Sequence, residues 1–154
     1  MATRAFDSPL GRLVLDAEGE MLTGVRWAAQ SEKPRTEGKG AMLSEVARQL
    51  DRYFAGRLKR FDLKIRSAGS PFQQSVWKAM RSIPWGKTGT YGGIAMVLSS
   101  GPRAVGTACG RNPMVIVTPC HRVLASGGAS GGYTGGQGLA TKRKLLALEG
   151  IDVD

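Results

Sequence analysis

The sequence predicts an α+β fold, in which a small antiparallel sheet with one helix is followed by a mostly helical part with a helix-turn-helix. Strand-like segments and turns fill the first 28 residues, and apolar residues recur at helical spacing after residue 70. A chain of 154 residues suits one domain or two small ones packed together. We therefore expect an N-terminal α/β domain over residues 1–68 and a C-terminal domain over residues 69–154.

The first domain is expected to begin with a β-meander. Residues 13–15 and 21–27 are strand-like, residues 18–20 suit the turn between them, and residues 8–11 suit an earlier turn. The polar segment 30–40 contains one proline and two glycines, which predicts a loop.

One helix and one further strand complete this domain. From Ala41, apolar residues recur at helical spacing as far as Phe54, and Gly56 lies just beyond the expected end. Residues 59–66 then alternate between apolar and charged side chains. That period of two predicts a strand with one buried face.

The second domain is expected to open with a helix. Residues 70–73 combine a serine N-cap, a proline at the first helical position and a glutamine three residues after the cap, and residues 83–86 end the helix. Residues 91–98 and 103–111 predict two short helices, joined by a tight turn at residues 99–102. This arrangement is typical of a helix-turn-helix.

The remaining segments carry weaker structural signals. Residues 115–117 form a short apolar run that leads to Pro119, and a last helix over residues 139–149 is closed by Gly150. The glycine-rich segment 127–138 is too irregular for a phosphate-binding loop and lacks the strand-to-helix context of one.

Charge is distributed unevenly along the chain, whose formal net charge is +10. No acidic residue lies between Asp62 and Glu149. That interval contains eleven basic residues: Lys64, Arg66, Lys78, Arg81, Lys87, Arg103, Arg111, Arg122, Lys142, Arg143 and Lys144. A surface with one sign of charge favours a polyanion, and nucleic acid is the leading candidate. A membrane surface is a weaker candidate, because no basic amphipathic helix is present.

The composition also bounds the compartment and the cofactors. No apolar run approaches the roughly 20 residues that span a bilayer, and the N-terminus lacks the core of a signal peptide. We expect a cytoplasmic protein with reduced cysteines. Zinc is not expected, because two cysteines and one histidine fall short of the four ligands of a structural site.

Cys120 is followed directly by His121, which is the only histidine of the chain. Cysteine reacts as the thiolate, so a reactive thiol with a pKa of roughly 8.5 needs a base or a positive field. A buried thiol beside an unrelated surface histidine is the alternative interpretation. Because adjacent residues of an extended chain point to opposite sides, we expect a water molecule to carry the proton between them.

Glu149 is the first carboxylate after Asp62 and lies at the end of the last predicted helix, where the helix dipole favours cations. A residue that violates such a rule is a candidate for function, and a carboxylate could fix the tautomer of His121. The resulting relay from Glu149 through His121 and water to Cys120 suits a cysteine hydrolase or a group-transfer protein. The basic surface and the lack of a protease signature favour a thiol that accepts an alkyl group.

Further segments match a known family in a fixed order. They are residues 70–77, 83–86, 91, 102–106, 112–113, 119–123, 131–136, 142–146 and 149–150. In these motifs the chain resembles the O6-alkylguanine-DNA alkyltransferases, also called methylated-DNA–protein-cysteine methyltransferases. The resemblance is strong from about residue 70 to residue 150 and weak before it. It implies a ribonuclease H-like N-terminal domain.

The resemblance also assigns catalytic roles. It implies that Cys120 is the nucleophile, that His121 acts as its base through water, and that Glu149 orients His121. Asn112 resembles the residue that braces the active-site turn. Tyr91 resembles the one that helps the guanine leave and presses on the phosphate of the flipped nucleotide.

Other matched residues face the DNA or the substrate. Arg103 resembles the finger that enters the duplex where the target base has left, and Ser126 resembles a position that contacts the backbone. Val123, Tyr133 and Thr134 match the substrate pocket. In this family the helix-turn-helix enters the minor groove.

The implied function is repair of double-stranded DNA. The alkyl group would move from O6 of guanine, and also from O4 of thymine, to Cys120 after the base has been flipped out of the stack. The thioether has no easy leaving route, so each molecule would react once. We expect a monomer without a cofactor. A non-catalytic lesion-binding or transcription-regulating module is the alternative.

The chain departs from the family pattern in two places. The turn between Tyr91 and Arg103 is short, which would alter the angle between the two helices. Gln137 and Gly138 add length after the paired glycines, which would loosen the pocket wall.

Related proteins that do not transfer alkyl groups carry tryptophan in place of the cysteine that this chain retains. Cys109 is expected to be a small buried residue rather than a second alkyl acceptor.

Overall fold

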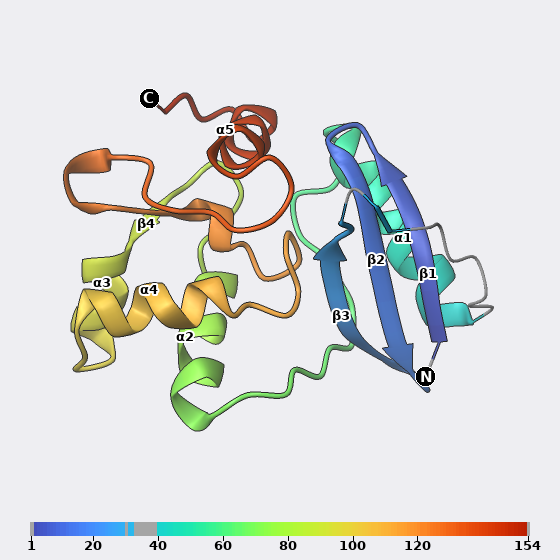
Figure 1. Cartoon of the computed structure of the whole chain (residues 1–154), viewed down its shortest axis with the longest axis horizontal. Helices are drawn as coiled ribbons and strands as arrows, with labels where there is room; N and C mark the ends of the chain where they lie inside the picture. The colour runs from blue at the N-terminus through green and yellow to red at the C-terminus, as the bar shows by residue number, and fades with distance from the viewer. Residues whose placement is uncertain (1, 30, 33–39, 154) are drawn as a thin grey trace.

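A computed structural model describes residues 2–29, 31–32 and 40–153. A sheet with one helix forms one side of the molecule, and the remaining helices form the other (Figure 1). The α+β fold class is therefore confirmed. The loop predicted over residues 30–40 lies largely outside the described residues.

The N-terminal sheet is an antiparallel meander of three strands. They are β1 (Ala2–Ser8), β2 (Gly11–Glu18) and β3 (Met21–Trp27), in the order β1-β2-β3. Helix α1 (Ala41–Phe54) covers one face, and its apolar stripe is buried against the sheet (Figure 1). The strands extend beyond the predicted segments, because the tight turns leave little chain outside the ladders.

The prediction of a strand over residues 59–66 is wrong. Its side chains do alternate between half-buried and exposed, but only Ile65 pairs, in a single parallel bridge with Leu22. Two hydrogen bonds form this bridge, from Leu22 N to the Lys64 carbonyl at 2.8 Å and from Arg66 N to the Leu22 carbonyl at 2.9 Å. Alternation reports that one face is buried, whereas a strand also needs a neighbour along its whole length.

Local signals determine the helices of the second part. They are α2 (Pro71–Arg81), α3 (Tyr91–Val97), α4 (Pro102–Gly110) and α5 (Leu139–Leu148). The predicted capping box is confirmed, since Ser70 Oγ accepts from Gln73 N at 3.1 Å and Gln73 Oε1 accepts from Ser70 N at 2.9 Å. Helices α3 and α4 pack together with α2 around a separate apolar cluster.

The apolar run 115–117 joins the two parts of the molecule. Val25 of β3 donates to the Pro113 carbonyl at 2.9 Å and accepts from Val115 N at 3.0 Å. The run itself is buried in the core of the sheet side. It leads directly into a turn of 3-10 helix, η1 (Cys120–Arg122), and then into β5 (Val123–Leu124), which pairs in parallel with β4 (Gly89–Thr90). The segment that carries Cys120 is thus anchored on both sides.

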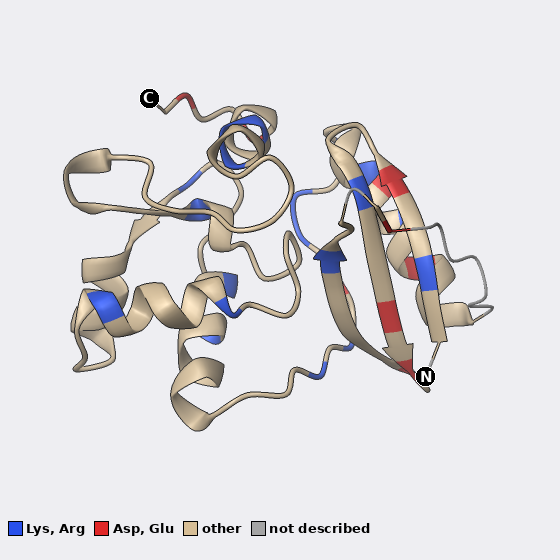
Figure 2. Cartoon of the chain, in the orientation of Figure 1, with Lys and Arg blue, Asp and Glu red and all other residues tan. Residues whose placement is uncertain are grey.

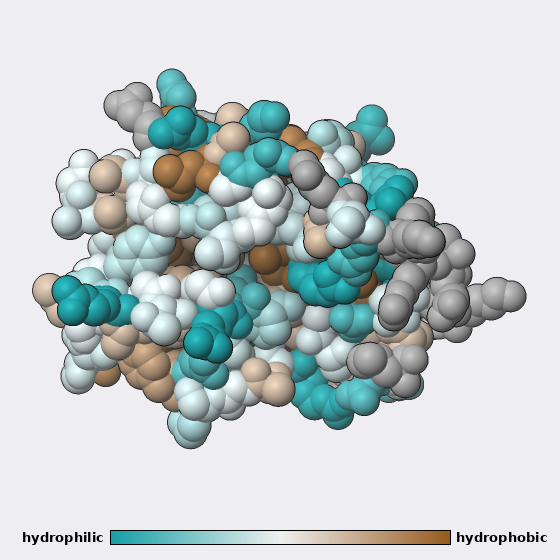
Figure 3. Space-filling view, viewed as in Figure 1, coloured by the Kyte–Doolittle hydropathy of each residue, from teal (hydrophilic) through white to brown (hydrophobic). Residues whose placement is uncertain are grey.

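Acidic and basic residues are distributed differently between the sheet side and the helical side of the molecule. Figure 2 shows acidic residues on the sheet side and at the C-terminal end, whereas the region of α2 to α4 carries basic residues only. On the face shown in Figure 3, apolar residues form separate patches among polar ones. No helix among the described residues has the length and apolar character needed to cross a membrane.

Candidate active site

Cys120 lies at a small pocket of about 130 Å³. The pocket is lined by residues from α3, α4, η1 and the glycine-rich segment, namely Tyr91, Gly106, Cys109, Gly110, Cys120, Gly132, Tyr133 and Thr134. Four residues predicted for the site from sequence are among them: Tyr91, Cys120, Tyr133 and Thr134. Tertiary packing has therefore placed the thiol and three predicted neighbours around one cavity.

The extended conformation assumed for Cys120 and His121 is wrong, because both lie in the 3-10 helix η1. Successive residues of a 3-10 helix are a third of a turn apart, so the two side chains still diverge. Cys120 is half-buried at the pocket, whereas His121 is fully buried. Among the described residues no partner hydrogen-bonds His121 Nδ1, so the ring makes no direct bond to the thiol.

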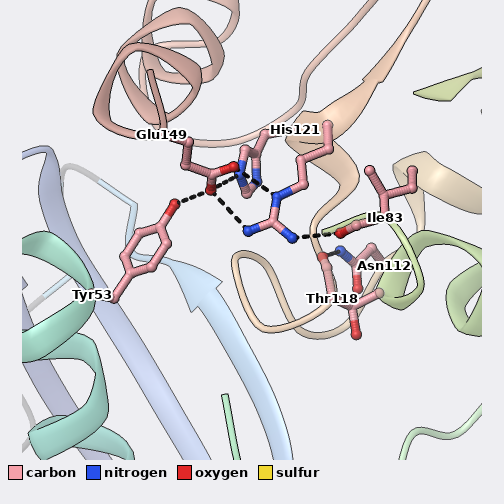
Figure 4. Close-up of polar contacts among 7 residues, drawn as sticks. Tyr53, Ile83, Asn112, Thr118, His121 and Glu149 are labelled. Carbon is pink, nitrogen blue, oxygen red and sulfur yellow. Dashed lines mark hydrogen bonds and ion pairs between the residues drawn. The ribbon is translucent and has the colours of Figure 1, made fainter. Parts of the chain in front are cut away.

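Glu149 holds His121 from the other side (Figure 4). Its Oε2 lies 2.7 Å from His121 Nε2 and accepts from the Tyr53 hydroxyl at 2.6 Å. Arg122 donates to both carboxylate oxygens, from Nε at 2.7 Å and from Nη2 at 3.1 Å. Arg122 in turn is fixed by a 2.7 Å bond to the Ile83 carbonyl. Residues from two segments distant from Glu149, Tyr53 of α1 and the pair His121 and Arg122 of η1, therefore surround one buried carboxylate.

The protonation states follow from these contacts. Burial acts to raise the pKa of Glu149, but hydrogen bonds from His121, Arg122 and Tyr53 outweigh it and lower the pKa to about 2. Burial lowers the pKa of His121, although Glu149 acts against this. At neutral pH the carboxylate is ionised and the imidazole is neutral. Nε2 then carries the proton that Glu149 accepts, which leaves Nδ1 as a free base.

Burial and two nearby groups bear on the Cys120 thiol. Burial raises its pKa, whereas a hydrogen bond from Asn112 and the charge of Lys142 lower it. Asn112 also braces the turn, since its side-chain amide donates to the Thr118 carbonyl at 2.7 Å (Figure 4) and accepts from Met114 N at 2.9 Å. Ionisation of Cys120 therefore needs a base as well as these contacts.

Tyr91 closes one side of the pocket against the glycine-rich segment. Gly131 has φ of 72°, and a Cβ placed on it would lie 2.9 Å from the Tyr91 ring, so only glycine fits there. The Lys142 ammonium lies 5.8 Å from the centre of the same ring and donates to the carbonyls of Val123 and Gly132, at 2.7 and 3.1 Å. Lys142 thus ties α5 to β5 and to the glycine-rich wall of the pocket.

The other predicted residues lie outside the cavity lining. Arg103 is exposed as the second residue of α4, and Ser126 is exposed at the start of the 3-10 helix η2 (Ser126–Gly128). Val123 is fully buried, and its side chain packs in the apolar cluster around α2. Cys109 is buried at the pocket wall beside Met80, and burial raises its pKa to about 12, which keeps it a thiol.

Sequence reasoning missed three residues of the site. Tyr53 and Arg122 bind Glu149 and were given no role, and Lys142 was noted only as a basic residue and as the first residue of a matched segment. Lys142 does carry a sequence signal, since with Leu145, Leu146 and Glu149 it shares one stripe of α5, where a lysine is unusual. Neither of the other two has a local signature.

Comparison with known proteins shows the family of this chain. The family description "6-O-methylguanine DNA methyltransferase, DNA binding domain" matches residues 71–151, and "6-O-methylguanine DNA methyltransferase, ribonuclease-like domain" matches residues 1–67. The chain belongs to the 6-O-methylguanine DNA methyltransferase family.

Relatives in the 6-O-methylguanine DNA methyltransferase family span almost the whole chain. A methylated-DNA–protein-cysteine methyltransferase of Mycobacterium bovis is 44% identical over 95% of this chain and 90% of its own length. One from Methanosarcina acetivorans is 42% identical, with 94% and 96% covered. The structure of Mycobacterium tuberculosis OGT in complex with DNA superimposes with a TM-score of 0.86 at 42% identity, covering 97% of this chain and 92% of that one.

Proposed function

We propose that this protein repairs double-stranded DNA by accepting an alkyl group from O6 of guanine, and also from O4 of thymine, onto Cys120. One observation carries the proposal: a half-buried thiol lines a small pocket, and its neighbour His121 is held by a buried carboxylate with one ring nitrogen unbonded among the described residues. Family membership supplies the substrate class.

The geometry supports a general-base mechanism. His121 Nδ1 takes the thiol proton of Cys120 through a water molecule, and Glu149 stabilises the imidazolium that forms. The thiolate then attacks the alkyl carbon, forming the S–C bond, and the C–O6 bond breaks with its electron pair moving to the guanine. Burial raises the pKa of Tyr91, so its hydroxyl stays protonated and can donate a hydrogen bond to the guanine, which leaves with the electron pair and then takes a proton from water.

The base must leave the stack to reach this pocket, because the half-buried Cys120 thiol lies in a small cavity that a base stacked within the duplex cannot enter. Arg103, which is exposed on α4, would fill the gap, and its planar guanidinium can stack on the neighbouring bases. Ser126 would contact the backbone. Binding is expected to be phosphate-dominated and tolerant of sequence, since damage has no fixed sequence context.

Further parts of the proposal concern the whole molecule. The alkylated thioether on Cys120 has no good leaving group, so each molecule reacts once. Residues 1–68 and 69–154 form two domains, a division supported by the boundary between the two family matches. The protein acts on DNA in the cytoplasm. It acts as a monomer, because one chain supplies both the pocket and the helix-turn-helix.

Intact mass spectrometry after mixing with an O6-methylguanine duplex tests this function. We expect the protein to gain one methyl group, located on the peptide that contains Cys120, and we expect Cys120→Ser to gain none. Cys109→Ser is the matched control and should still be methylated, because its thiol stays protonated. Binding to the duplex without any methyl gain would establish the non-catalytic lesion-binding alternative instead.

A further inference from the structure

Trp27 links the N-terminal sheet to the wall of the pocket. Its indole N–H donates to the Tyr133 hydroxyl at 2.9 Å, and Tyr133 lines the pocket beside Cys120. Trp27 ends β3, pairs with Leu13 in the β2–β3 ladder, and is only 8% exposed. A side chain that is held by a sheet and a packed core is a rigid support for a loop.

The same indole supports the backbone next to Tyr133. Gly135 has φ of 91°, and a Cβ placed on it would lie 3.0 Å from the Trp27 ring. The chain therefore rests directly on the ring at a position where a side chain would force the two apart. Trp27 thus fixes both the position of the Tyr133 hydroxyl and the path of the backbone at Gly135, two residues later.

The hydrogen bond also orients the hydroxyl. A tyrosine oxygen can accept two hydrogen bonds and donate one, and Trp27 occupies an acceptor position. Burial, and then the charge of Cys120, raise the pKa of Tyr133, so the hydroxyl remains protonated. Its O–H is therefore directed away from Trp27, and the hydroxyl remains a neutral donor.

We propose that Trp27 is a positioning residue for alkyl transfer, which holds the Tyr133 wall in the geometry that presents the substrate to Cys120. This inference rests on the proposed function. It makes the N-terminal sheet part of the active centre, although its residues lie outside the pocket lining.

The test uses Trp27→Phe, which keeps an aromatic ring on Gly135 and removes the N–H donor. Methylation of Cys120 is followed by mass against duplex concentration, which separates the limiting rate from half-saturation. We expect the limiting rate to fall about tenfold, the factor typical of one lost hydrogen bond, with half-saturation unchanged because Arg103 and α4 are untouched. A limiting rate equal to that of the unaltered protein would overturn the inference.

A double-mutant cycle with Tyr133→Phe shows whether Trp27 acts through Tyr133. The double variant should be no slower than Tyr133→Phe alone, whereas multiplied losses would overturn the inference. Ile65→Ala is the matched control, since it cuts apolar packing in the same core without touching the pocket. It should lower the melting temperature and leave the limiting rate unchanged, and an equal slowing would reduce Trp27 to a structural role.

Amide hydrogen exchange of residues 131–136 provides a readout that needs no reaction. Trp27→Phe should speed exchange in this segment, and Ile65→Ala should not. If the unaltered protein gained no methyl group, the proposed function would fail, and exchange would still decide whether Trp27 holds the loop. Unchanged exchange of residues 131–136 in Trp27→Phe would show that Trp27 does not hold the loop in place.

Discussion

Replacing Glu149 by glutamine should destabilise the protein by about 3 kcal/mol at neutral pH. A fall in pKa from 4.5 to about 2 corresponds to this amount, because each pKa unit is worth about 1.4 kcal/mol. The same size follows from the ion pair, since the change leaves the Arg122 guanidinium, 8% exposed, without its counter-charge. Removing one partner of a buried ion pair costs about 3–5 kcal/mol.

The effect should depend on pH in a defined direction. The pKa of Glu149 is lower in the folded protein than in the unfolded chain, so its stabilisation is complete above about pH 4.5 and is lost as pH falls toward 2. Urea unfolding at pH 7 and pH 3 measures this. The difference between the unaltered protein and Glu149→Gln should narrow from about 3 to about 1 kcal/mol.

Two results would refute the reasoning. A loss below about 1 kcal/mol at pH 7 would mean that the carboxylate is not the centre of a buried network. A difference of equal size at both pH values would mean that the loss comes from packing rather than from charge. Asp51→Asn is the matched control, because Asp51 is an exposed carboxylate on α1 and should show little change at either pH.

Three further predictions concern the relay, the DNA contact and a helix cap. Because burial lowers the pKa of His121, the transfer rate should hold steady as pH falls through 6.5 and decline only at lower pH; a decline centred at 6.5 or above in a pH–rate profile would contradict this. Arg103→Ala should slow repair of duplex DNA far more than reaction with free O6-benzylguanine, and equal losses would exclude the finger role. Ser70→Ala should lower the free energy of unfolding by about 1 kcal/mol in urea titrations, through loss of the capping box.

Elements with local causes were predictable. The serine, proline and glutamine at residues 70–73 start α2 because each acts within one turn of the helix. The turn between α3 and α4 lies where the sequence predicts it, and there Ser99 adopts φ of 53°, which a short connection imposes on a residue other than glycine. The prediction of a strand over residues 59–66 failed because alternation of apolar and charged residues reveals a buried face and says nothing about a neighbouring strand.

The chemistry of the candidate site was also visible in the sequence, but its support was not. A single histidine beside a cysteine, and a carboxylate after a long acid-free interval, were enough to propose a relay. That His121 Nε2 faces Glu149, leaving Nδ1 as the base, depends on where α5 packs against η1. The orientation of a ring is a property of packing, which residue types alone do not fix.

The sequence by itself determined the reactive groups, the basic surface and the local elements, because residue type, spacing and charge act over a few positions. Only the tertiary structure decided which groups from the sheet side reach the centre. Tyr53 meets Glu149 across 96 residues of chain, and Trp27 meets Tyr133 across 106. Contacts so distant in sequence follow from the packing of two cores against each other, and no local pattern encodes them.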